Sequence, residues 1–575
     1  MSAVDLARDL WLLLAALGLN IAVGHAGQPL LGQGAFVAVG GYGTALLADA
    51  AGWPLGLAGA AAVAVAGVLG WVLAYGTSRL QGASLALGTW ALAWLVAGVL
   101  EAFPGRFGGP QGLVREAPAT LVMPGLGLEW RLTPAWHVLL AGLLCGAAMV
   151  ATWWLRRSGV GLDLAALRDG AAAAESVGVR PAPLRRGALA AAAALGGLAG
   201  AGTVVLLGVV APSDVAPLLS VQLFAAVLLG GVATVWGPVV GVAVLVALPG
   251  VADRLADLLG TPPERSRGVL VAAFLVAALA LRAPVAGWLR AALPRRIGGD
   301  SRGVPPPGDV ATPGPVPNGG RLAAHDLRFA YGGVRVLDGV GLELRPGEVH
   351  ALVGPNGSGK TTALRLLAGA LPMQGGGVHL GDVDVTSRGQ SARVRLGLAR
   401  TFQRTVLFPR LTVLAHAEVG ARAVDEVGAV RTLLATPQAT RAARARRERA
   451  RAALVTVGLA ERAAAHPAEL SAGEQRLLQV ARAAATGAGV LLLDEPAAGM
   501  TAGERTALVT VVRRLAGNGT AVLLVEHDMR LVAALADRVT VLAEGRVLAA
   551  GSVAEMQADP AVRAAYLGEP PAAPA

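Results

Sequence analysis

Nine residues, Gly354–Thr362, read GPNGSGKTT and could bind a chain of phosphates. The spacing Gly-x-x-x-x-Gly-Lys-Thr lies between a strand-like run, VHALV, and a helix-like run, TTALRLLAG, which is the setting that a phosphate-binding loop requires. Glycines let backbone N–H groups surround phosphate oxygens, and the helix N-terminus adds the positive end of its dipole. We expect nucleotide to be bound by Gly354, Pro355, Asn356, Gly357, Ser358, Gly359, Lys360, Thr361 and Thr362.

Lys360 is the single lysine among the 49 lysine and arginine residues of the chain. A compact ammonium on a slim stem can reach phosphates inside a tight loop, whereas the broad planar fork of an arginine would crowd it. We predict that Lys360 contacts the β- and γ-phosphates and that the Thr361 hydroxyl binds Mg²⁺.

Two further apolar runs end in residues that could do chemistry. VLLLDEP (490–496) ends in Asp494, which suits water-mediated Mg²⁺ binding, and in Glu495, which could activate the attacking water as a general base. LLVEHD (523–528) ends in His527, which taken alone is more often a structural histidine than a catalytic one. These runs and the short glycine-bounded elements around them predict an α/β domain from residue 321 onward.

The first half of the sequence is of a different kind. The chain is 54% hydrophobic and only 15% charged, with a mean hydropathy of +0.58, against about 25% charged residues in a soluble protein. Apolar runs near the length of a bilayer-spanning helix recur, and they predict a polytopic α-helical membrane domain of about nine segments. The expected segments are 9–27, 30–50, 55–77, 83–103, 136–155, 187–210, 218–234, 236–251 and 267–287.

The distribution of arginines predicts the orientation of these segments. The loop 156–186 is rich in arginine and should face the cytoplasm, as should the arginines that follow the last segment. An even number of crossings must separate them, which favours splitting the late apolar region at Pro238. Counting back places the N-terminus and the segment 104–135 outside. The first segment lacks a positive leader, so we expect a retained helix rather than a signal peptide.

Composition excludes other readings. The net charge is +11, but the basic excess is spread over both halves, so nucleic-acid binding is not expected. The single cysteine, Cys145, lies in an apolar run and should only pack. A proline- and glycine-rich stretch indicates a linker. The expected divisions are a membrane domain at 1–297, a linker at 298–320, a nucleotide-binding domain at 321–568 and a disordered tail at 569–575.

One membrane stretch, 18–43, contains Asn20, His25, Gln28 and Gln33 among glycines and a proline. Polar groups in lipid are costly unless they face protein or a water-filled cavity. Two interpretations remain open. The stretch could be a broken or re-entrant segment that lines a pathway, or its polar side chains could hydrogen-bond between helices.

The phosphate-binding loop, ARTFQRT, LSAGEQ (470–475), LLLDEP and the strand-end histidine together resemble the ATP-binding cassette of ABC transporters, across residues 321–575. The resemblance implies that Tyr331 stacks on adenine and that Gln403 senses Mg²⁺ and the membrane domain. It also implies that Ser471 and Gly473 contact the γ-phosphate bound by an opposing cassette, which His527 holds. The sequence departs from the family at LSAGEQ and at AAGMT (497–501), where an aspartate is common.

ARTFQRTVLFPRLTVLAH, LLLDEPAAGM and AVRAAYLGE look like the ATP-binding subunit of high-affinity branched-chain amino acid importers. LNIAVGHAGQPLLGQGAFVAVGGYG, RLQGASLALGTWAL and GGPQGL resemble their permease. The resemblance implies two fused subunits of one importer in the cytoplasmic membrane, which use ATP and Mg²⁺. Implied partners are a second permease and ATP-binding subunit or a second copy, an extracytoplasmic solute-binding protein, the solute and membrane lipid. A half-exporter remains an alternative, and a non-transport ABC ATPase requires the membrane segments to be wrong.

The cytoplasmic loop 161–179, GLDLAALRDGAAAAESVGV, resembles the segment through which these importers couple permease to cassette. Ala173, Ala174 and Gly178 fit the spacing of small residues in that segment. Small residues let a short helix seat in a groove, and we expect that groove to lie on the cassette near Gln403. The alternative is a solvated amphipathic loop.

Overall fold

The structure is a computed structural model of the 575-residue chain. It describes residues 2–259 and 320–567, apart from the short gaps 78–79, 81, 116–119, 124–127, 216, 425–427, 429–430 and 433–435, together with 269, 272–274 and 276. The chain divides into two compact units. The first comprises Met1–Arg157 and Ala182–Gly299, and the second comprises Ser158–Pro181 and Asp300–Ala575.

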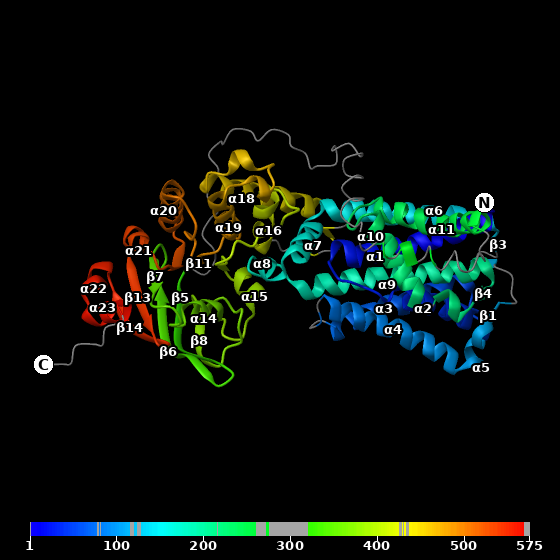
Figure 1. The fold of residues 1–575 in the computed structure, drawn as a ribbon, viewed down its shortest axis with the longest axis horizontal. Coiled ribbons are helices and arrows are strands. Elements are labelled where there is room, and N and C mark those ends of the chain that lie inside the picture. The colour runs from blue at the N-terminus through cyan, green and yellow to red at the C-terminus, as the bar shows by residue number, and fades with distance from the viewer. Residues whose placement is uncertain are drawn as a thin grey trace. The chain divides into compact units, whose positions relative to one another are not determined.

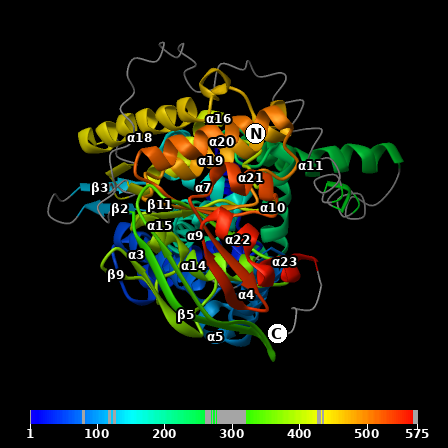
Figure 2. The same cartoon turned by 90° about the vertical axis from the view of Figure 1, so that its left-hand side faces the viewer.

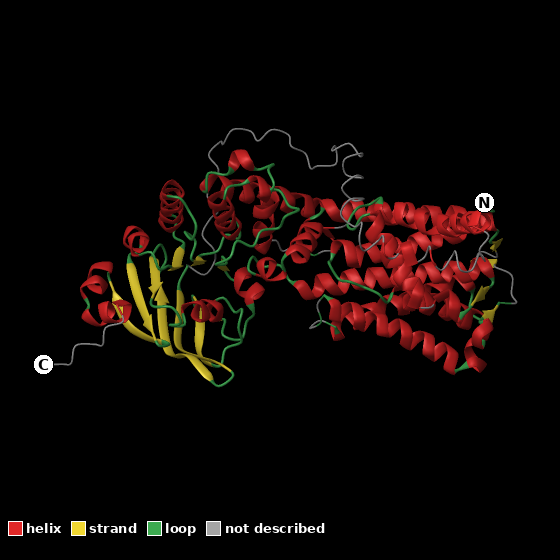
Figure 3. Ribbon diagram, viewed as in Figure 1, coloured by secondary structure: helices red, strands yellow, loops and turns green. Residues whose placement is uncertain are grey.

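The first unit is built almost entirely of helices (Figure 3). Its main helices are α1 (Ala3–Asn20), α2 (Gln33–Ala45), α3 (Leu55–Gly76), α4 (Ala83–Ala102), α6 (Pro134–Arg157), α9 (Pro181–Leu207), α10 (Pro217–Gly230) and α11 (Gly237–Leu259). Shorter helical pieces are η1 (Ile21–His25), η2 (Leu46–Ala50), α5 (Pro104–Phe107), η3 (Gly109–Gln111) and η4 (Pro212–Val215). Two small ribbons pair β1 (Leu113–Val114) with β4 (Val209–Val210) and β2 (Thr120–Met123) with β3 (Leu128–Arg131).

Seven helices of the described residues are long and apolar enough to cross a membrane, judged by length and composition: Ala3–His25, Leu55–Gly76, Ala83–Ala102, Pro134–Arg157, Pro181–Leu207, Pro212–Gly230 and Gly237–Arg254. The predicted division before Pro238 is confirmed, because α10 and α11 are separate helices. The predicted segment 30–50 is wrong in its start: residues 26–32 are non-helical, and the helical part, α2 with η2, is glycine-rich and includes Gln33 and Asp49. The ninth predicted segment, the linker and the tail lie mainly outside the described residues.

The polar stretch near the start of the chain is a break between two helices. The backbone leaves the helix after the π-turn η1, runs irregularly through 26–32 and re-enters a helix at Gln33. The buried Asn20 side chain donates to the Thr234 carbonyl at 2.9 Å and accepts from the Ala233 N–H at 3.0 Å. Asn20 thereby satisfies backbone groups of a second irregular stretch, between α10 and α11, which lipid could not satisfy.

Gln33 has a similar role deeper in the unit. Its Nε2 donates to the carbonyls of Ala15 and Ala192, at 3.1 and 3.0 Å, and joins α2 to α1 and α9. The structure therefore supports the hydrogen-bonding interpretation and the break that the other interpretation requires, whereas a pathway lined by this stretch stays a prediction. The segment is broken, and two of its polar side chains form hydrogen bonds between elements.

The second unit has two sheets (Figure 1). One has the order β10-β11-β12-β7-β13-β14: β10 (Leu398–Arg400), β11 (Val490–Asp494), β12 (Ala521–Val525), β7 (Val349–Val353), β13 (Arg538–Ala543) and β14 (Arg546–Gly551). The other has the order β6-β5-β8-β9: β6 (Val334–Leu344), β5 (Leu322–Tyr331), β8 (Gly375–Leu380) and β9 (Val383–Asp384).

Helices of this unit pack beside the sheets, with α18, α19 and α20 grouped together in Figure 2. They are α7 (Gly159–Asp169), α8 (Ala171–Glu175), α14 (Lys360–Leu367), α15 (Gln390–Arg395), α16 (Val413–Ala421), α18 (Pro437–Thr456), α19 (Ala472–Ala484), α20 (Ala502–Gly517), α21 (Met529–Leu535), α22 (Val553–Ala558) and α23 (Pro560–Leu567), with short turns η5 (Arg422–Val424), η6 (Ala460–Arg462) and η7 (Pro467–Glu469). Strands β7, β11 and β12 are buried at every residue, which is typical of a parallel sheet covered on both faces.

Strand register brings the predicted chemical groups to one edge. Strands β11, β12 and β7 are adjacent and parallel, with Asp494 opposite Val525 and Val525 opposite Leu352. Their carboxyl ends therefore coincide. The phosphate-binding loop follows β7, Glu495 follows β11, and His527 follows β12 by two residues. Ligands bind at such an edge in open α/β sheets.

Candidate functional site

The phosphate-binding loop has the backbone that its glycines predict. Gly354 and Gly359 have φ values of 151° and 101°, which favour glycine. A Cβ on Gly354 would collide with the Leu542 carbonyl oxygen. Lys360 begins α14, and its Nζ donates to the carbonyls of Gly354 and Pro355, both at 2.8 Å. The ammonium therefore lies inside the curve of the loop, where a phosphate chain would pass.

The other loop residues divide by exposure. Asn356 and Gly357 are exposed at the tip of the loop, whereas Ser358 and Thr362 are buried under it. Thr361 is half-buried in the first turn of α14. The nine residues 354–362 thus form the loop after β7 and the first turn of α14.

Asp494 ends β11 and is 1% exposed. Arg400, at the end of the neighbouring strand β10, donates from Nη2 to its Oδ2 at 3.0 Å. Burial raises the pKa of Asp494, although the Arg400 charge opposes this shift. The second oxygen, Oδ1, is buried with no hydrogen-bond partner among the described residues. Strand β11 contacts helix α14, in which Thr361 lies. A buried carboxylate oxygen without a partner and a hydroxyl are the kinds of oxygen ligand that Mg²⁺ prefers.

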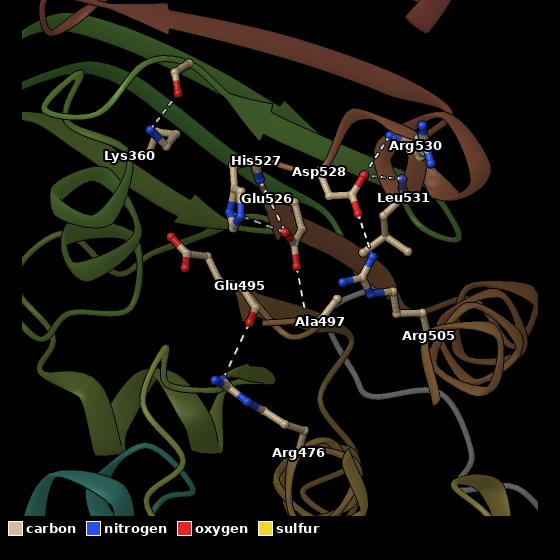
Figure 4. Close-up of polar contacts among 11 residues, drawn as sticks. Lys360, Arg476, Glu495, Ala497, Arg505, Glu526, His527, Asp528, Arg530 and Leu531 are labelled. Carbon is tan, nitrogen blue, oxygen red and sulfur yellow. Dashed lines mark hydrogen bonds and ion pairs between the residues drawn. The ribbon is translucent and has the colours of Figure 1, made fainter. Parts of the chain in front are cut away.

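Glu495 follows Asp494 with a φ of 45°, an uncommon conformation for a residue with a side chain. Its N–H donates to the Val525 carbonyl at 2.9 Å, and its own carbonyl accepts from Arg476 at 3.5 Å. The carboxylate is near enough to Lys360 to oppose the lowering of the lysine pKa by burial. Figure 4 shows the side chains of Lys360, Glu495 and His527 at this edge of the sheet.

His527 lies two residues beyond β12, and its side chain is 68% exposed. Beneath it, Glu526 is 1% exposed and accepts hydrogen bonds from the N–H groups of Ala497 at 3.0 Å and His527 at 3.3 Å. Burial raises the pKa of Glu526, and these two bonds oppose the rise. Glu526 therefore fixes the backbone under the histidine to the loop that follows Glu495 (Figure 4).

Tyr331 and Gln403 belong to neither of the strand ends that contain Glu495 and His527. Tyr331 ends β5, is 46% exposed and packs edge to face against Phe329, so one face of its ring is available. Gln403 is exposed in the loop after β10, and its carbonyl accepts a hydrogen bond from Arg476 at 2.5 Å.

The loop that contains Gln403 is held by one helix, α19. Arg476, Gln479 and Arg482 recur every three residues along α19 and donate to the carbonyls of Gln403, Arg404 and Val406. Residues at this spacing lie near one face of a helix. Ser471 caps the N-terminus of α19, so the same helix carries Ser471 and holds the loop that contains Gln403.

Ser471 and Gly473 lie together at the start of α19 and contact Glu504 of α20. Ser471 Oγ donates to Glu504 Oε1 at 2.9 Å. A Cβ on Gly473 would collide with the same carboxylate. Ser471 and Gly473, which were predicted to act together, therefore lie together, and both contact the carboxylate of Glu504.

The segment between α6 and α9 packs on the cassette, as the small residues predicted. Ala173 and Ala174 are buried in α8. Gly178 has a φ of 92°, and a Cβ there would lie 3.0 Å from that of Ala423. A Cβ on Gly170 would contact Val406, in the loop that contains Gln403.

Sequence reasoning missed four residues of this site: Arg400, Arg476, Glu526 and Glu504. Arg400 and Glu526 each lie within a stretch that was recognised, ARTFQRT and LLVEHD, but the sequence did not show that their side chains are buried. Glu504 follows Thr501 by three residues, a spacing that predicts a helix cap but not a contact with another helix.

Comparisons with known proteins agree for both halves. Residues 6–279 match the family described as the permease component of the branched-chain amino acid transport system. Residues 337–498 match ABC transporter, and residues 546–572 match branched-chain amino acid ATP-binding cassette transporter. The chain belongs to the branched-chain amino acid ABC transporter family. It joins a permease and an ATP-binding cassette of that family in one chain.

The family's ATP-binding proteins align with the second half. The chain is 37% identical over 249 residues to the high-affinity branched-chain amino acid transport ATP-binding protein LivG of Escherichia coli strain K12, covering 43% of this chain and 98% of LivG. It is 34% identical over 249 residues to BraF of Pseudomonas aeruginosa, with the same coverage. A nucleotide-free ATP-binding cassette from an ABC transporter is 26% identical, with a TM-score of 0.38, and the match covers 43% of this chain and 98% of that one.

Membership of the branched-chain amino acid ABC transporter family establishes the general activity. The chain is a membrane protein with an ATP-binding domain, and ATP hydrolysis is coupled to transport. This confirms the predicted fold class, with a helical membrane half followed by an α/β ATPase.

Proposed function

We propose that the chain imports branched-chain amino acids, or related small solutes, across the cytoplasmic membrane as a fused permease and ATPase subunit. The observation that supports this most directly is the presence of a family permease and a family ATP-binding cassette in one chain. The names of LivG and BraF supply the solute class. The half-exporter alternative has no comparable support, since the membrane half matches a permease component.

Within the cassette, the loop 354–362 binds the phosphates of ATP and Tyr331 stacks on the adenine. Lys360 neutralises charge on the β- and γ-phosphates. Glu495 accepts a proton from the attacking water, and its N–H bond to the neighbouring strand fixes where the carboxylate points. His527 contacts the γ-phosphate from its exposed position above Glu526. A Mg²⁺ ion held by Thr361, Gln403 and Asp494 would neutralise charge developing on the phosphates.

The site is completed by a second cassette. One phosphate-binding loop and one LSAGEQ loop make two separate half-sites, and Ser471 and Gly473 contact the ATP of an opposing cassette. That partner is a second permease and ATPase subunit or a second copy of this chain, and an extracytoplasmic binding protein delivers the solute. The N-terminus lies outside and the cassette in the cytoplasm, as the arginine-rich loop favours.

Coupling runs through residues 158–181. This segment contacts the loop 403–408, and α19 holds that loop by three side chains while presenting Ser471 at its own N-terminus. A movement of the permease segment therefore reaches the half-site for the opposing cassette through one rigid helix.

The proposal is tested with the assembled transporter in nanodiscs. ATP hydrolysis is measured while candidate binding proteins are added with leucine, isoleucine, valine, an amide or urea. Stimulation by a loaded binding protein, with uptake of the same solute into liposomes, supports the proposal. Full solute-stimulated hydrolysis by a monomeric chain, or ATP-driven solute movement only in the opposite direction, contradicts it.

A further inference from the structure

The Glu504 carboxylate occupies the half-site that Ser471 and Gly473 would offer to ATP. Ser471 Oγ donates to Glu504 Oε1 at 2.9 Å, and the Gly473 backbone packs directly against the same carboxylate. The carboxylate lies against Gly473 so closely that no side chain fits there. The Ser471 hydroxyl, which we assign to the γ-phosphate, is therefore already hydrogen-bonded to an anion of the same chain, and this anion also covers the Gly473 backbone.

The surroundings favour an anion at this place. Ser471 is the N-cap of α19, a helix of 13 residues, and the first N–H groups of a helix carry partial positive charge. Carboxylate and phosphate oxygens accept the same kinds of hydrogen bond from such groups. The hydrogen bonds to Glu504 lower its pKa, which keeps it ionised.

Glu504 has a second contact that holds it in place. Its Oε2 accepts hydrogen bonds from the N–H and Oγ1 of Thr501, at 2.9 and 3.0 Å, in the capping box of α20. One carboxylate thus bridges the caps of α19 and α20 and uses a different oxygen for each helix. A γ-phosphate cannot bond to Ser471 and Gly473 until Oε1 has left them.

We propose that Glu504 is an internal substitute for the γ-phosphate on the LSAGEQ loop, and that it sets how much ATP is needed to close the two cassettes. This inference rests on the roles proposed above for Ser471 and Gly473. In the ATP-free chain the carboxylate accepts from Ser471 and covers Gly473. During closure the phosphate of the opposing ATP displaces it, and mutual repulsion of the two anions makes closure require more ATP than a neutral residue at 504 would.

The proposed roles are tested first. The assembled transporter carrying Glu495→Gln in nanodiscs is mixed with Mg-ATP, and the ATP retained after rapid gel filtration is measured. We expect retained ATP, and we expect Ser471→Ala to abolish it. If Glu495→Gln retains no ATP, or if Ser471→Ala has no effect, the proposed function of this half-site fails, whatever Glu504 does.

The inference is then tested with Glu504→Gln in the same background. The amide keeps an oxygen that can cap Thr501 but removes the charge, so the ATP concentration for half-maximal retention should fall about tenfold. Glu555→Gln is the matched control, because Glu555 closes the same kind of capping box on a different helix, α22, through Ser552. We expect that control to stay within about twofold of the parent.

An unchanged or higher ATP requirement in Glu504→Gln would overturn the inference. An equal decrease in the ATP requirement of Glu555→Gln would also overturn it, because any loss of an acidic helix cap would then have the same effect. Circular dichroism of each variant at the assay temperature verifies that the chain remains folded.

Discussion

The Asp163 carboxylate pairs with the Arg422 guanidinium, with 2.7 Å between Oδ2 and Nε. Both side chains are largely buried, at 9% and 14% exposure. Asp163 belongs to α7, which leaves the membrane helices, and Arg422 follows α16 of the cassette. The pair therefore fastens the start of the permease segment to the ATPase.

We predict that Asp163→Asn weakens this attachment and uncouples the two halves. Removing one partner of a buried pair costs about 3–5 kcal/mol, and about 1.4 kcal/mol already corresponds to a factor of ten. Solute-stimulated ATP hydrolysis should fall about tenfold or more while basal hydrolysis persists. The double exchange Asp163→Arg with Arg422→Asp should restore part of the stimulation. Normal stimulation in Asp163→Asn would show that the pair is dispensable.

The other end of the segment should be sensitive to size. Gly178 has a φ of 92° and lies against Ala423, so Gly178→Leu would meet both backbone strain and a collision. We expect loss of transport with basal ATP hydrolysis retained, and a similar result for Ala174→Leu, since Ala174 is fully buried. Liposome uptake and ATP hydrolysis are measured on the same preparations. Intact transport in both variants would make the segment a mere connector.

Several of these elements could be predicted from the sequence because local pattern determines them. Short apolar runs that lead into Asp494, Glu495 and His527 are typical of buried strands of a parallel sheet, and adjacent parallel strands place their ends at one edge. The glycine spacing of the phosphate-binding loop likewise predicts positive φ values, which Gly354 and Gly359 have.

Contacts between distant residues could not be predicted in this way. Arg400 and Asp494 are 94 positions apart, and Ser471 and Glu504 are 33 apart. Each pair is set by how helices and strands pack, and neither residue of a pair reveals its partner. The start of α2 was missed for a related reason. In the non-helical stretch before α2, the Leu31 N–H donates to Thr89 Oγ1 at 3.0 Å, and an apolar run does not reveal a partner 58 positions away.

Glu495→Gln should bind ATP and fail to hydrolyse it. The amide keeps the shape of the side chain but cannot accept a proton from water, and a positioned base contributes about 10²–10⁴-fold to such reactions. We expect hydrolysis to fall about 100-fold or more, measured as phosphate release, with ATP binding retained in a filter assay. Turnover within a few-fold of the unmodified chain would identify another residue as the main base.

The cassette should lose stability below neutral pH through His416. This ring is buried, its Nε2 accepts from the Phe408 N–H at 2.8 Å, and burial lowers its pKa to about 3. The unfolded chain binds a proton near pH 6.5 and the folded chain does not, so the free energy of unfolding falls by about 1.4 kcal/mol per pH unit from 6.5 towards 3.

Calorimetry of the full chain in detergent at pH 8 and pH 5.5 measures this effect. His416→Gln removes the titration while an amide oxygen can still accept from Phe408. The decrease in Tm of the cassette between the two pH values should be smaller in the variant by about 2–4 °C. His350, whose pKa burial lowers to about 4, titrates in the same direction and remains in both chains, so it cancels in the comparison. Equal decreases would show that His416 is not responsible.

Lys360 allows a test that few nucleotide sites permit, since no other lysine competes for an amine-reactive label. Without nucleotide, burial lowers the pKa of Lys360 and so favours the neutral amine, which is the reactive form. Its Nζ donates hydrogen bonds to two carbonyls of the loop. Bound ATP should cover the amine and hold it charged, because anionic phosphates stabilise the ammonium. We therefore expect Mg-ATP to slow labelling of the Lys360 peptide, which mass spectrometry measures. We also expect hydrolysis to fall as labelling rises.

The variant Lys360→Arg tests whether shape matters as well as charge. It keeps the charge but not the shape, so it should still abolish most hydrolysis. Labelling that ignores ATP, or a fully active arginine variant, would mean that this lysine does not contact the phosphates.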